Sequence, residues 1–218
     1  MIHAVIFDMD GTLIDTEKLH TACWRQASKE YGYPMSMETG LRMRSLAAEY
    51  AELMLQELYG KEYDFEKVRR FKQRLMDEMV NAHPIEKKEG AEELLCWLKE
   101  KGYKCAVATA SNPVNTKKWL RELKLRDYFD YVVSAQQVPH GKPMPDIYLE
   151  VCKVIGEEPE NCIAIEDSPN GALSAIRAGC KTIMVPDLTP VPEELKSGLF
   201  GEADNLKEVI GFLKEQTE

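Results

Sequence analysis

The sequence predicts an α/β fold with a doubly wound, mostly parallel sheet and an inserted all-helical cap domain. Short, continuous apolar runs without alternation indicate strands that are covered on both faces, as in a parallel sheet. The runs are His3–Phe7, Cys105–Ala108, Tyr131–Val133, Cys162–Ile165 and Thr182–Val185. Helical patterns alternate with most of these runs, which favours crossover connections between parallel strands. A helix-rich block after the first run interrupts the alternation and predicts the insertion.

The helical patterns between the strands have residues at their ends that start or stop helices. Gly102 and Gly156 follow two of the patterns. Ser168 and Pro169 begin the last one, with a capping serine and a proline in the first turn. The patterns cover Ala91–Lys101, Pro113–Leu123, Pro145–Ile155 and the stretch from Pro169 to Gly179. Each therefore predicts a helix that returns the chain to the start of the next strand.

The predicted cap domain is the segment 16–82, which contains no convincing strand. Its helical patterns are Thr21–Tyr31, Ser45–Tyr59 and Phe65–Asn81. The α/β core domain then consists of residues 1–15 and 83–218. We expect the two connections between cap and core near Asp15–Thr16 and His83–Glu89.

Composition limits the classes of function. The 218 residues are 44% hydrophobic and 30% charged, as in an ordinary globular protein with a core. The net charge of -9 argues against nucleic acid or an acidic membrane surface as a partner. No apolar run approaches the roughly 18 residues that span a bilayer, and no signal peptide pattern is present. Six cysteines lie mostly in apolar stretches without a Cys-x-x-Cys pair, which predicts reduced, buried thiols. We expect a cytoplasmic protein and, by default, a monomer.

Two aspartates follow the first predicted strand, in the sequence Asp8-Met9-Asp10-Gly11-Thr12. Residues two apart in extended chain point to the same side, so the two carboxylates start close together. Gly11 permits a sharp turn directly after them. Paired acids can bind a hard cation, or one can attack a substrate while the other transfers a proton. The simpler alternative is a turn rich in Asp and Gly, and this motif alone does not decide between the two.

Three further polar groups follow later strands. Thr109-Ala110-Ser111-Asn112 begins a predicted helix, where hydroxyl and backbone N–H groups can bind an anion. Lys142 lies between Gly141 and the prolines of Gly141-Lys142-Pro143-Met144-Pro145, and a rigid lysine can neutralise a carboxylate and a phosphate. A second acidic pair, Glu166-Asp167, ends the fourth strand. Helix caps and a solvated lysine would explain each signal separately. Because ligands bind at the carboxyl ends of the strands in such sheets, the four together predict one site.

These motifs resemble those of the haloacid dehalogenase superfamily, in the branch that contains β-phosphoglucomutase and small-molecule phosphatases. The matching segments are FDMDGTLIDT, VATASN, HGKPMPDIY and IEDSPNGALSAIRAG, and the resemblance covers essentially the whole chain. It implies a Rossmann-like core with a helical cap and a Mg²⁺ cofactor. It also implies an enzyme that transfers phosphate from a small phosphorylated metabolite.

The resemblance implies a role for each motif residue. Asp8 attacks phosphorus and becomes an aspartyl phosphate, Asp10 is the general acid and base, and Thr109 and Lys142 bind the phosphoryl group. Metal ligands are Asp8, the Asp10 carbonyl, Glu166 and Asp167, while Gly11, Ser111 and Asn112 contact phosphate or substrate. Mg²⁺ and Lys142 would offset the negative charge that accumulates in phosphoryl transfer. A pKa of Asp10 raised by a second acid would suit its alternation between acid and base.

The acceptor of the phosphate is less well defined by the sequence. Water as acceptor makes a phosphatase, and a sugar hydroxyl makes a mutase of the β-phosphoglucomutase type. His20 and Lys72 match cap positions of the mutase, although packed or solvated side chains would explain both. Leu46 stands where the mutases have an arginine that grips the distal phosphate, and Arg42 or Arg44 could substitute only in a different register. We therefore expect a phosphatase of phosphosugars or nucleotide-like monoesters.

Two functions without catalysis are alternatives. A phospho-accepting receiver module shares an acidic cluster, a hydroxyl and a lysine on a doubly wound sheet. Such modules are shorter, have no large helical insertion after the first strand, and have their acceptor aspartate in mid-chain. A protein that only binds a partner would not need the complete set of motifs. The sequence therefore favours an enzyme.

Overall fold

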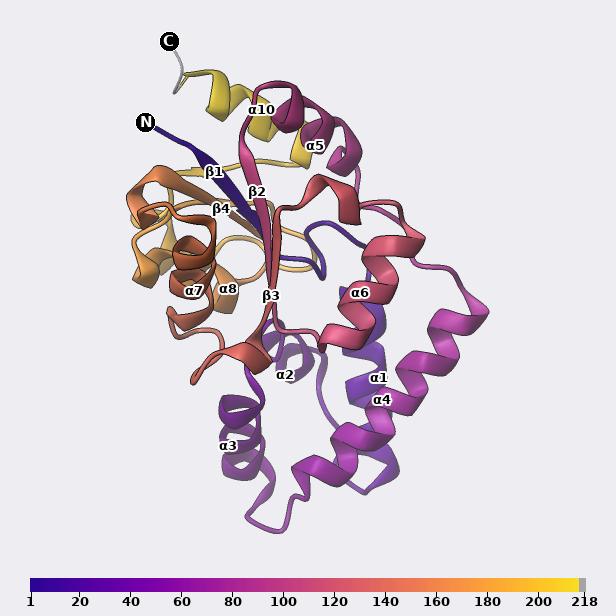
Figure 1. Cartoon of the computed structure of the whole chain (residues 1–218). Coiled ribbons are helices and arrows are strands. Elements are labelled where there is room, and N and C mark those ends of the chain that lie inside the picture. Colours follow the sequence, from indigo (N-terminus) through magenta and orange to yellow (C-terminus); the bar gives the residue numbers. More distant parts are fainter. Residues whose placement is uncertain (216–218) are drawn as a thin grey trace.

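A computed structural model describes residues 1–215 and confirms the predicted fold class (Figure 1). Six parallel strands form one sheet in the order β3-β2-β1-β4-β5-β6. The strands are β1 (Ala4–Phe7), β2 (Lys104–Thr109), β3 (Tyr131–Ser134), β4 (Cys162–Glu166), β5 (Lys181–Met184) and β6 (Gly201–Glu202). The edge strand β6 was not predicted, because two residues are too short to give an apolar run.

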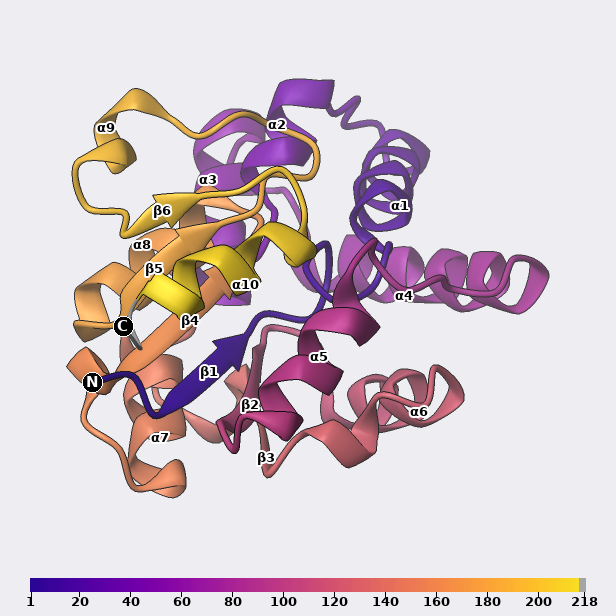
Figure 2. The ribbon, with the colours of Figure 1, turned by 90° about the horizontal axis from the view of Figure 1, so that it is seen from above.

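Helices cover both faces of the sheet (Figures 1 and 2). The core helices are α5 (Ala91–Glu100), α6 (Pro113–Glu122), α7 (Asp146–Ile155), α8 (Pro169–Ala178), α9 (Glu193–Lys196) and α10 (Leu206–Glu215). Short 3₁₀ turns are η1 (Arg126–Tyr128), η2 (Ala135–Gln137) and η3 (Pro159–Asn161). Apolar residues of α5, α6 and α10 share one buried cluster with alternate residues of β1, such as Val5 and Phe7. Residues of α7 and α8 share a second cluster with Ala4 and Ile6. The central strand is therefore buried on both sides, as its continuous apolar run predicted.

The register of the central strands places the predicted site residues side by side. Phe7 at the end of β1 pairs with Val107 of β2 and with Ile165 of β4. Asp8 therefore leaves the sheet level with Ala108 and Glu166. All strands are parallel, so these carboxyl ends share one edge, which faces the helical segment below the sheet in Figure 1.

The helical segment consists of α1 (Glu17–Glu30), α2 (Met37–Arg42), α3 (Ala48–Tyr59) and α4 (Phe65–Ala82). It has its own hydrophobic cluster, which includes Ala27, Leu55 and Tyr63. Aromatic rings reinforce it: Trp24 stacks on Phe65 with ring centroids 5.6 Å apart. We call residues 16–82 the cap, and their movement as a separate domain stays a prediction.

One predicted cap helix begins later than expected. The pattern from Ser45 to Tyr59 predicted a single helix, but α3 starts only at Ala48. Ser45 has a φ of 53°, a left-handed conformation that no helix accommodates. The residues from Met43 to Ala47 are consequently a loop between α2 and α3. This loop carries Arg44 to the edge of the sheet.

The two connections between cap and core run beside each other. The Asp15 N–H donates to the Glu86 carbonyl at 2.9 Å, and the Lys88 N–H donates to the Leu13 carbonyl at 2.9 Å. Asp15 and the segment around Glu86 lie within the predicted hinges. Within residues 1–215, no helix has the length and apolar character needed to cross a membrane. All six cysteines are free, and five are buried, in keeping with their predicted role as small apolar residues.

Candidate active site

Lys142 holds the first acid of the site in place. Its fully buried ammonium donates to Asp8 Oδ1 at 2.5 Å, to Glu166 Oε1 at 2.6 Å and to the Ala108 carbonyl at 3.0 Å. Burial acts to lower the pKa of Lys142, but the carboxylates of Asp8 and Glu166 outweigh it and raise the pKa. Lys142 is therefore a permanent cation, and Asp8 keeps one oxygen, Oδ2, without a hydrogen-bond partner.

Asp8, Glu166 and Asp167 form a buried acidic cluster that could hold a metal ion. One carboxylate oxygen of each lies within 4.8 Å of the others. Asp8 Oδ2, Glu166 Oε2 and Asp167 Oδ1 are buried without hydrogen-bond partners, which is costly unless a cation binds them. Burial raises the pKa of Asp167 to about 7, although Arg44 acts to lower it. Hard divalent cations prefer such oxygen ligands, so the residues fit the predicted ion. The Asp10 side chain is not part of the cluster; its carbonyl stays a predicted ligand.

Two glycines make room for the acidic residues. A Cβ on Gly11, which has a φ of +84°, would lie 2.3 Å from Asp167 Oδ2. A Cβ on Gly171, in the first turn of α8, would lie 2.0 Å from Glu166 Oε2. Backbone therefore approaches both carboxylates more closely than any side chain would allow. Gly11 leaves space beside the cluster, and its contact with substrate stays a prediction.

Asp10 lies beside this cluster with both oxygens in hydrogen bonds. Its Oδ1 accepts from Thr16 Oγ1 at 2.6 Å, and its Oδ2 accepts from Ser111 Oγ at 2.7 Å and Thr109 Oγ1 at 3.4 Å. Burial acts to raise the pKa of Asp10, but the hydrogen bonds and charge of His20, with Thr16 and Ser111, lower it to about 2. The expected raised pKa of Asp10 is therefore wrong for this arrangement. The hydrogen-bond donors around the carboxylate decide the direction of the pKa shift.

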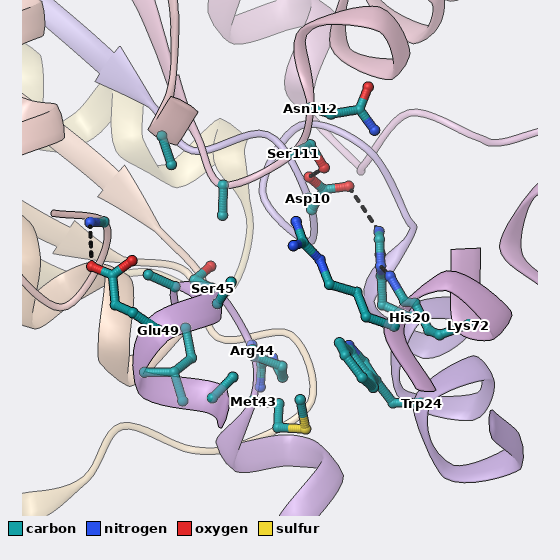
Figure 3. A pocket seen from close by; sticks show the side chains of 18 of the residues that line it. Asp10, His20, Trp24, Met43, Arg44, Ser45, Glu49, Lys72, Ser111 and Asn112 are labelled. Carbon is teal, nitrogen blue, oxygen red and sulfur yellow. Dashed lines mark hydrogen bonds and ion pairs between the residues drawn. The ribbon is translucent and has the colours of Figure 1, made fainter. Parts of the chain in front are cut away.

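His20 and Lys72 of the cap extend the network from Asp10 (Figure 3). His20 Nε2 lies 3.4 Å from Asp10 Oδ1, and His20 Nδ1 lies 2.6 Å from Lys72 Nζ. Burial lowers the pKa of His20, and the charge of Lys72 lowers it further. Lys72 is itself buried, with its Nζ 5.6 Å from the centre of the Trp24 ring. His20 thus lies next to Asp10, and Lys72 lies against the other ring nitrogen of His20.

Thr109, Ser111 and Asn112 connect β2 to α6. The Ser111 N–H donates to Thr109 Oγ1 at 3.0 Å, which fixes the turn after the strand. Asn112 caps α6, because its Oδ1 accepts from the Asn115 N–H at 2.9 Å. The predicted helix cap is real, and Ser111 and Asn112 also line the cavity described below.

Arg44 directs its guanidinium at Asp167, a residue of the acidic cluster. Its Nη2 donates to Asp167 Oδ2 at 2.5 Å and to the Asp167 carbonyl at 2.7 Å. Its Nη1 donates to Thr189 Oγ1 at 2.9 Å, and its Nε lies 3.8 Å from Glu17 Oε2. The side chain is almost fully buried. Its guanidinium is therefore directed at the protein, and its contact with substrate stays a prediction.

A cavity of about 360 Å³ lies between the cap and the carboxyl ends of the strands (Figure 3). Its core wall includes Asp8, Asp10, Ser111 and Asn112; its cap wall includes Glu17, His20, Trp24, Arg44, Leu46, Arg69 and Lys72. The volume suits a small metabolite. Seven of the predicted site residues thus line this one cavity, which carries both acids and cations: Asp8, Asp10, His20, Arg44, Lys72, Ser111 and Asn112.

Comparison with known proteins agrees with this geometry. A family model described as haloacid dehalogenase-like hydrolase matches residues 2–179, which include all four strand-end motifs. The chain belongs to this family. Its members include enzymes that are named phosphatases, and the chain is accordingly an enzyme of the phosphatase and phosphotransferase type, as predicted.

This haloacid dehalogenase-like hydrolase is similar to two named enzymes and to a solved structure. A phosphorylated carbohydrates phosphatase of Thermotoga maritima is 33% identical over 98% of this chain and 99% of its own length. A β-phosphoglucomutase of Bacillus subtilis is 30% identical over 80% of this chain and 79% of its own. The crystal structure of CbbY from Rhodobacter sphaeroides in complex with phosphate has a TM-score of 0.79 and 26% identity, covering 96% of each chain. The resemblance predicted from the motifs is confirmed.

Two residues of the hydrolase's site were not predicted. Glu17 begins α1, is buried and lines the cavity, and burial together with Asp167 and Asp10 raises its pKa. In the sequence it is only an acid in the first turn of a helix, which is common. Tyr148 of α7 is fully buried and donates to Glu166 Oε1 at 2.5 Å. Its one signal was a tyrosine in an apolar helix face, where the hydroxyl needs a partner.

Replacing Tyr148 by Phe is expected to reduce turnover about tenfold without preventing folding. The Tyr148 hydroxyl and Lys142 Nζ both donate to Glu166 Oε1. Without the hydroxyl, the Glu166 carboxylate, a predicted metal ligand, is less firmly oriented. Loss of such a supporting hydrogen bond typically costs about 10–100-fold in activity or metal affinity. Steady-state kinetics of Y148F against Y131F, which alters a half-exposed tyrosine, measures the effect. Equal rates for the two variants would show that Lys142 alone positions Glu166.

Proposed function

We propose that the chain is a Mg²⁺-dependent phosphatase that hydrolyses small phosphate monoesters through an aspartyl phosphate on Asp8. The observation that carries this proposal is the convergence of a nucleophile candidate, a second acid, a buried lysine and an acidic pair at one sheet edge. Asp8 and Glu166 share the Lys142 ammonium, Asp167 completes the cluster, and Asp10 lies beside them. The phosphosugar and nucleotide-like monoesters are the proposed substrates.

The cation would be held by Asp8, Glu166 and Asp167, with the Asp10 carbonyl as a further ligand. When bound, Mg²⁺ supplies positive charge beside the phosphate and offsets the charge of the acidic cluster. Lys142 contributes the remaining fixed positive charge from the opposite oxygen of Asp8. Both charges favour approach of an anionic carboxylate to an anionic phosphate, which is the main obstacle in this reaction.

In the first half-reaction, an oxygen of Asp8 forms a bond to phosphorus while the bond from phosphorus to the ester oxygen breaks. The departing oxygen takes a proton from Asp10. Asp10 must therefore be protonated when substrate is present, although its pKa is about 2 in the free site. A phosphate dianion next to Asp10 would raise that pKa, because a neighbouring like charge disfavours ionisation.

In the second half-reaction, Asp10 is the base. It takes a proton from the incoming water, the water oxygen bonds to phosphorus, and the bond from phosphorus to Asp8 breaks. Asp10 is ionised in the free site and hydrogen-bonded through both oxygens, so it is ready for this step once the leaving group has gone. Asp8 is regenerated with its Oδ1 on Lys142.

The loop before α3 favours water rather than a sugar as acceptor. Leu46, at the position of the mutase arginine, packs against the hydrophobic cluster of the cap. Arg44 uses its fork on Asp167 and Thr189, so it is poorly placed to grip a distal phosphate. The relative named phosphorylated carbohydrates phosphatase supports a phosphosugar as substrate.

A β-phosphoglucomutase activity is the second candidate. His20 and Lys72 form a polar cluster in the cap wall that contacts Asp10 of the core, and a relative of 30% identity is named β-phosphoglucomutase. Arg69 also lines the cavity and could bind a second phosphate from its rim. The two candidates share every step on Asp8 and differ only in the second acceptor.

Incubation with β-glucose 1-phosphate and a bisphosphate primer is expected to release inorganic phosphate and little glucose 6-phosphate. A wider panel of phosphosugars and nucleoside monophosphates, with Mg²⁺ or with EDTA, then ranks the substrates. EDTA is expected to remove the activity, because Asp8, Glu166 and Asp167 would lose their cation.

Two outcomes would contradict the proposal. Glucose 6-phosphate as the main product would make the enzyme a mutase. Undiminished phosphate release in EDTA, after exhaustive dialysis, would exclude the proposed role of Mg²⁺.

A further inference from the structure

The Arg44 guanidinium joins the cap to the predicted cation site. It donates two hydrogen bonds to Asp167, one to the carboxylate and one to the backbone carbonyl. Its ion pair with Asp167 links the cap directly to the acidic cluster of Asp8, Glu166 and Asp167. Both partners are almost fully buried, so solvent does not screen the pair.

The loop that carries Arg44 is held in place by the core. Asn170 Nδ2 donates to the Arg42 carbonyl at 3.0 Å and to the Arg44 carbonyl at 2.8 Å. On the other side of the loop, the Ala47 N–H donates to the Lys142 carbonyl at 2.9 Å. The left-handed Ser45 lies between these anchors. A non-glycine residue in this conformation needs surrounding contacts to maintain it, and the anchors supply them.

The two carboxylate oxygens of Asp167 differ in their contacts. Arg44 takes Oδ2, while Oδ1 is buried without a hydrogen-bond partner. Asp8 Oδ2 and Glu166 Oε2 are likewise without partners, and one oxygen of each of the three carboxylates lies within 4.8 Å of the others. Arg44 therefore fixes the orientation of Asp167 and leaves one oxygen for the cation.

We propose that Arg44 is a positioning residue for the cation site, so that docking of the cap completes the geometry in which Asp167 binds the metal. The inference rests on the proposed function, which supplies the cation. Arg44 does not contact the metal itself: it holds Asp167 through both a side-chain and a backbone oxygen. Outer partners that orient metal ligands in this way typically contribute about 10–100-fold to metal affinity.

A positioning role and a competing charge lead to opposite results. If Arg44 only supplied positive charge near the site, its removal would tighten cation binding, because repulsion would be lost. If Arg44 orients Asp167, its removal weakens binding. Asn170 acts one step further away, because its amide donates to backbone carbonyls of the Arg44 loop and so holds the loop in place. Loosening that loop should weaken binding to a smaller extent.

The test measures Mn²⁺ affinity of the unliganded enzyme by electron paramagnetic resonance of free Mn²⁺, with Mg²⁺ as competitor. Mn²⁺ takes the same hard oxygen ligands as Mg²⁺. We expect Arg44→Gln to raise the Mn²⁺ Kd about tenfold or more. Arg44→Lys, which keeps the charge and one donor, should give an intermediate Kd, and Asn170→Ala a smaller rise. Arg70→Gln removes the same charge from an exposed site on α4 and should leave Kd unchanged.

Each result has a defined meaning. An Arg44→Gln Kd equal to or tighter than that of the wild type overturns the positioning role. If that variant does not fold by circular dichroism, the Arg44→Lys and Asn170→Ala variants decide, and wild-type Kd values for both overturn it. Failure of the wild-type enzyme to bind Mn²⁺ would reject the cation of the proposed function and this inference together. Binding that survives Asp167→Asn would place the metal elsewhere and also overturn the inference.

Discussion

Replacing Asp8 by Asn is expected to lower kcat by at least about 10⁴-fold, a loss comparable to that of removing a catalytic nucleophile in other enzymes. An amide oxygen is a far weaker nucleophile than a carboxylate and cannot form the acyl phosphate. The change is isosteric, and the Asn side-chain oxygen can still accept from Lys142 Nζ. The protein should therefore fold normally. Phosphate release under saturating substrate measures the loss, and rapid acid quenching with mass spectrometry should detect a phosphoryl adduct only in the wild type.

The control is Asp127→Asn, which makes the same chemical change at an exposed position in η1. It should retain wild-type turnover. If the Asp8 variant kept more than about a hundredth of wild-type kcat, a different group would have to carry the phosphate. A phosphoryl adduct that persisted in that variant would lead to the same conclusion.

The core of the site was predictable because parallel strands end at a common edge. Asp8, Thr109 and Glu166 each follow or end an apolar run, and the register of β1 with β2 and β4 brings these ends together. Their proximity depends only on strand identity and strand direction, which the sequence patterns indicate. Lys142 follows from the same logic, since its loop returns to the same edge after β3.

The contribution of the cap was less predictable, because it depends on how two layers dock. Arg44 and Asp167 are 123 residues apart, and their contact requires a left-handed Ser45 that the residue type does not signal. The pattern from Ser45 to Tyr59 is compatible with a helix, so local propensity favoured the wrong structure. The predicted rise in the pKa of Asp10 was wrong for a related reason. The direction of this pKa shift depends on Thr16, His20 and Ser111, and their distances from Asp10 cannot be derived from sequence spacing.

Replacing Lys142 by Met is expected to lower the free energy of unfolding by about 3–5 kcal/mol in EDTA, because it leaves buried carboxylates without their cation. Lys142 is fully buried and is paired with both Asp8 and Glu166. For a protein of this size, the loss corresponds to a fall in Tm of roughly 6–20 °C. Methionine fills much of the same volume, so a cavity would contribute little. Thermal and chemical unfolding in EDTA measure the change.

Excess Mg²⁺ should recover part of this loss, because a bound cation would neutralise the same carboxylates from the other side of Asp8. Lys153→Met is the matched control: the Lys153 side chain is 75% exposed in its pair with Glu150, and its loss should change stability by no more than about 0.5 kcal/mol. If the Lys142 and Lys153 variants were equally stable in EDTA, Lys142 would not be the main compensation for Asp8 and Glu166. If Mg²⁺ raised the stability of the Lys153 variant by the same amount as that of the Lys142 variant, the effect would be general stabilisation by the cation, not replacement of the lost Lys142 charge. The difference in stability between the two variants in EDTA thus measures how much Lys142 stabilises the acidic cluster. The part of that difference that Mg²⁺ removes measures how much the cation can replace Lys142.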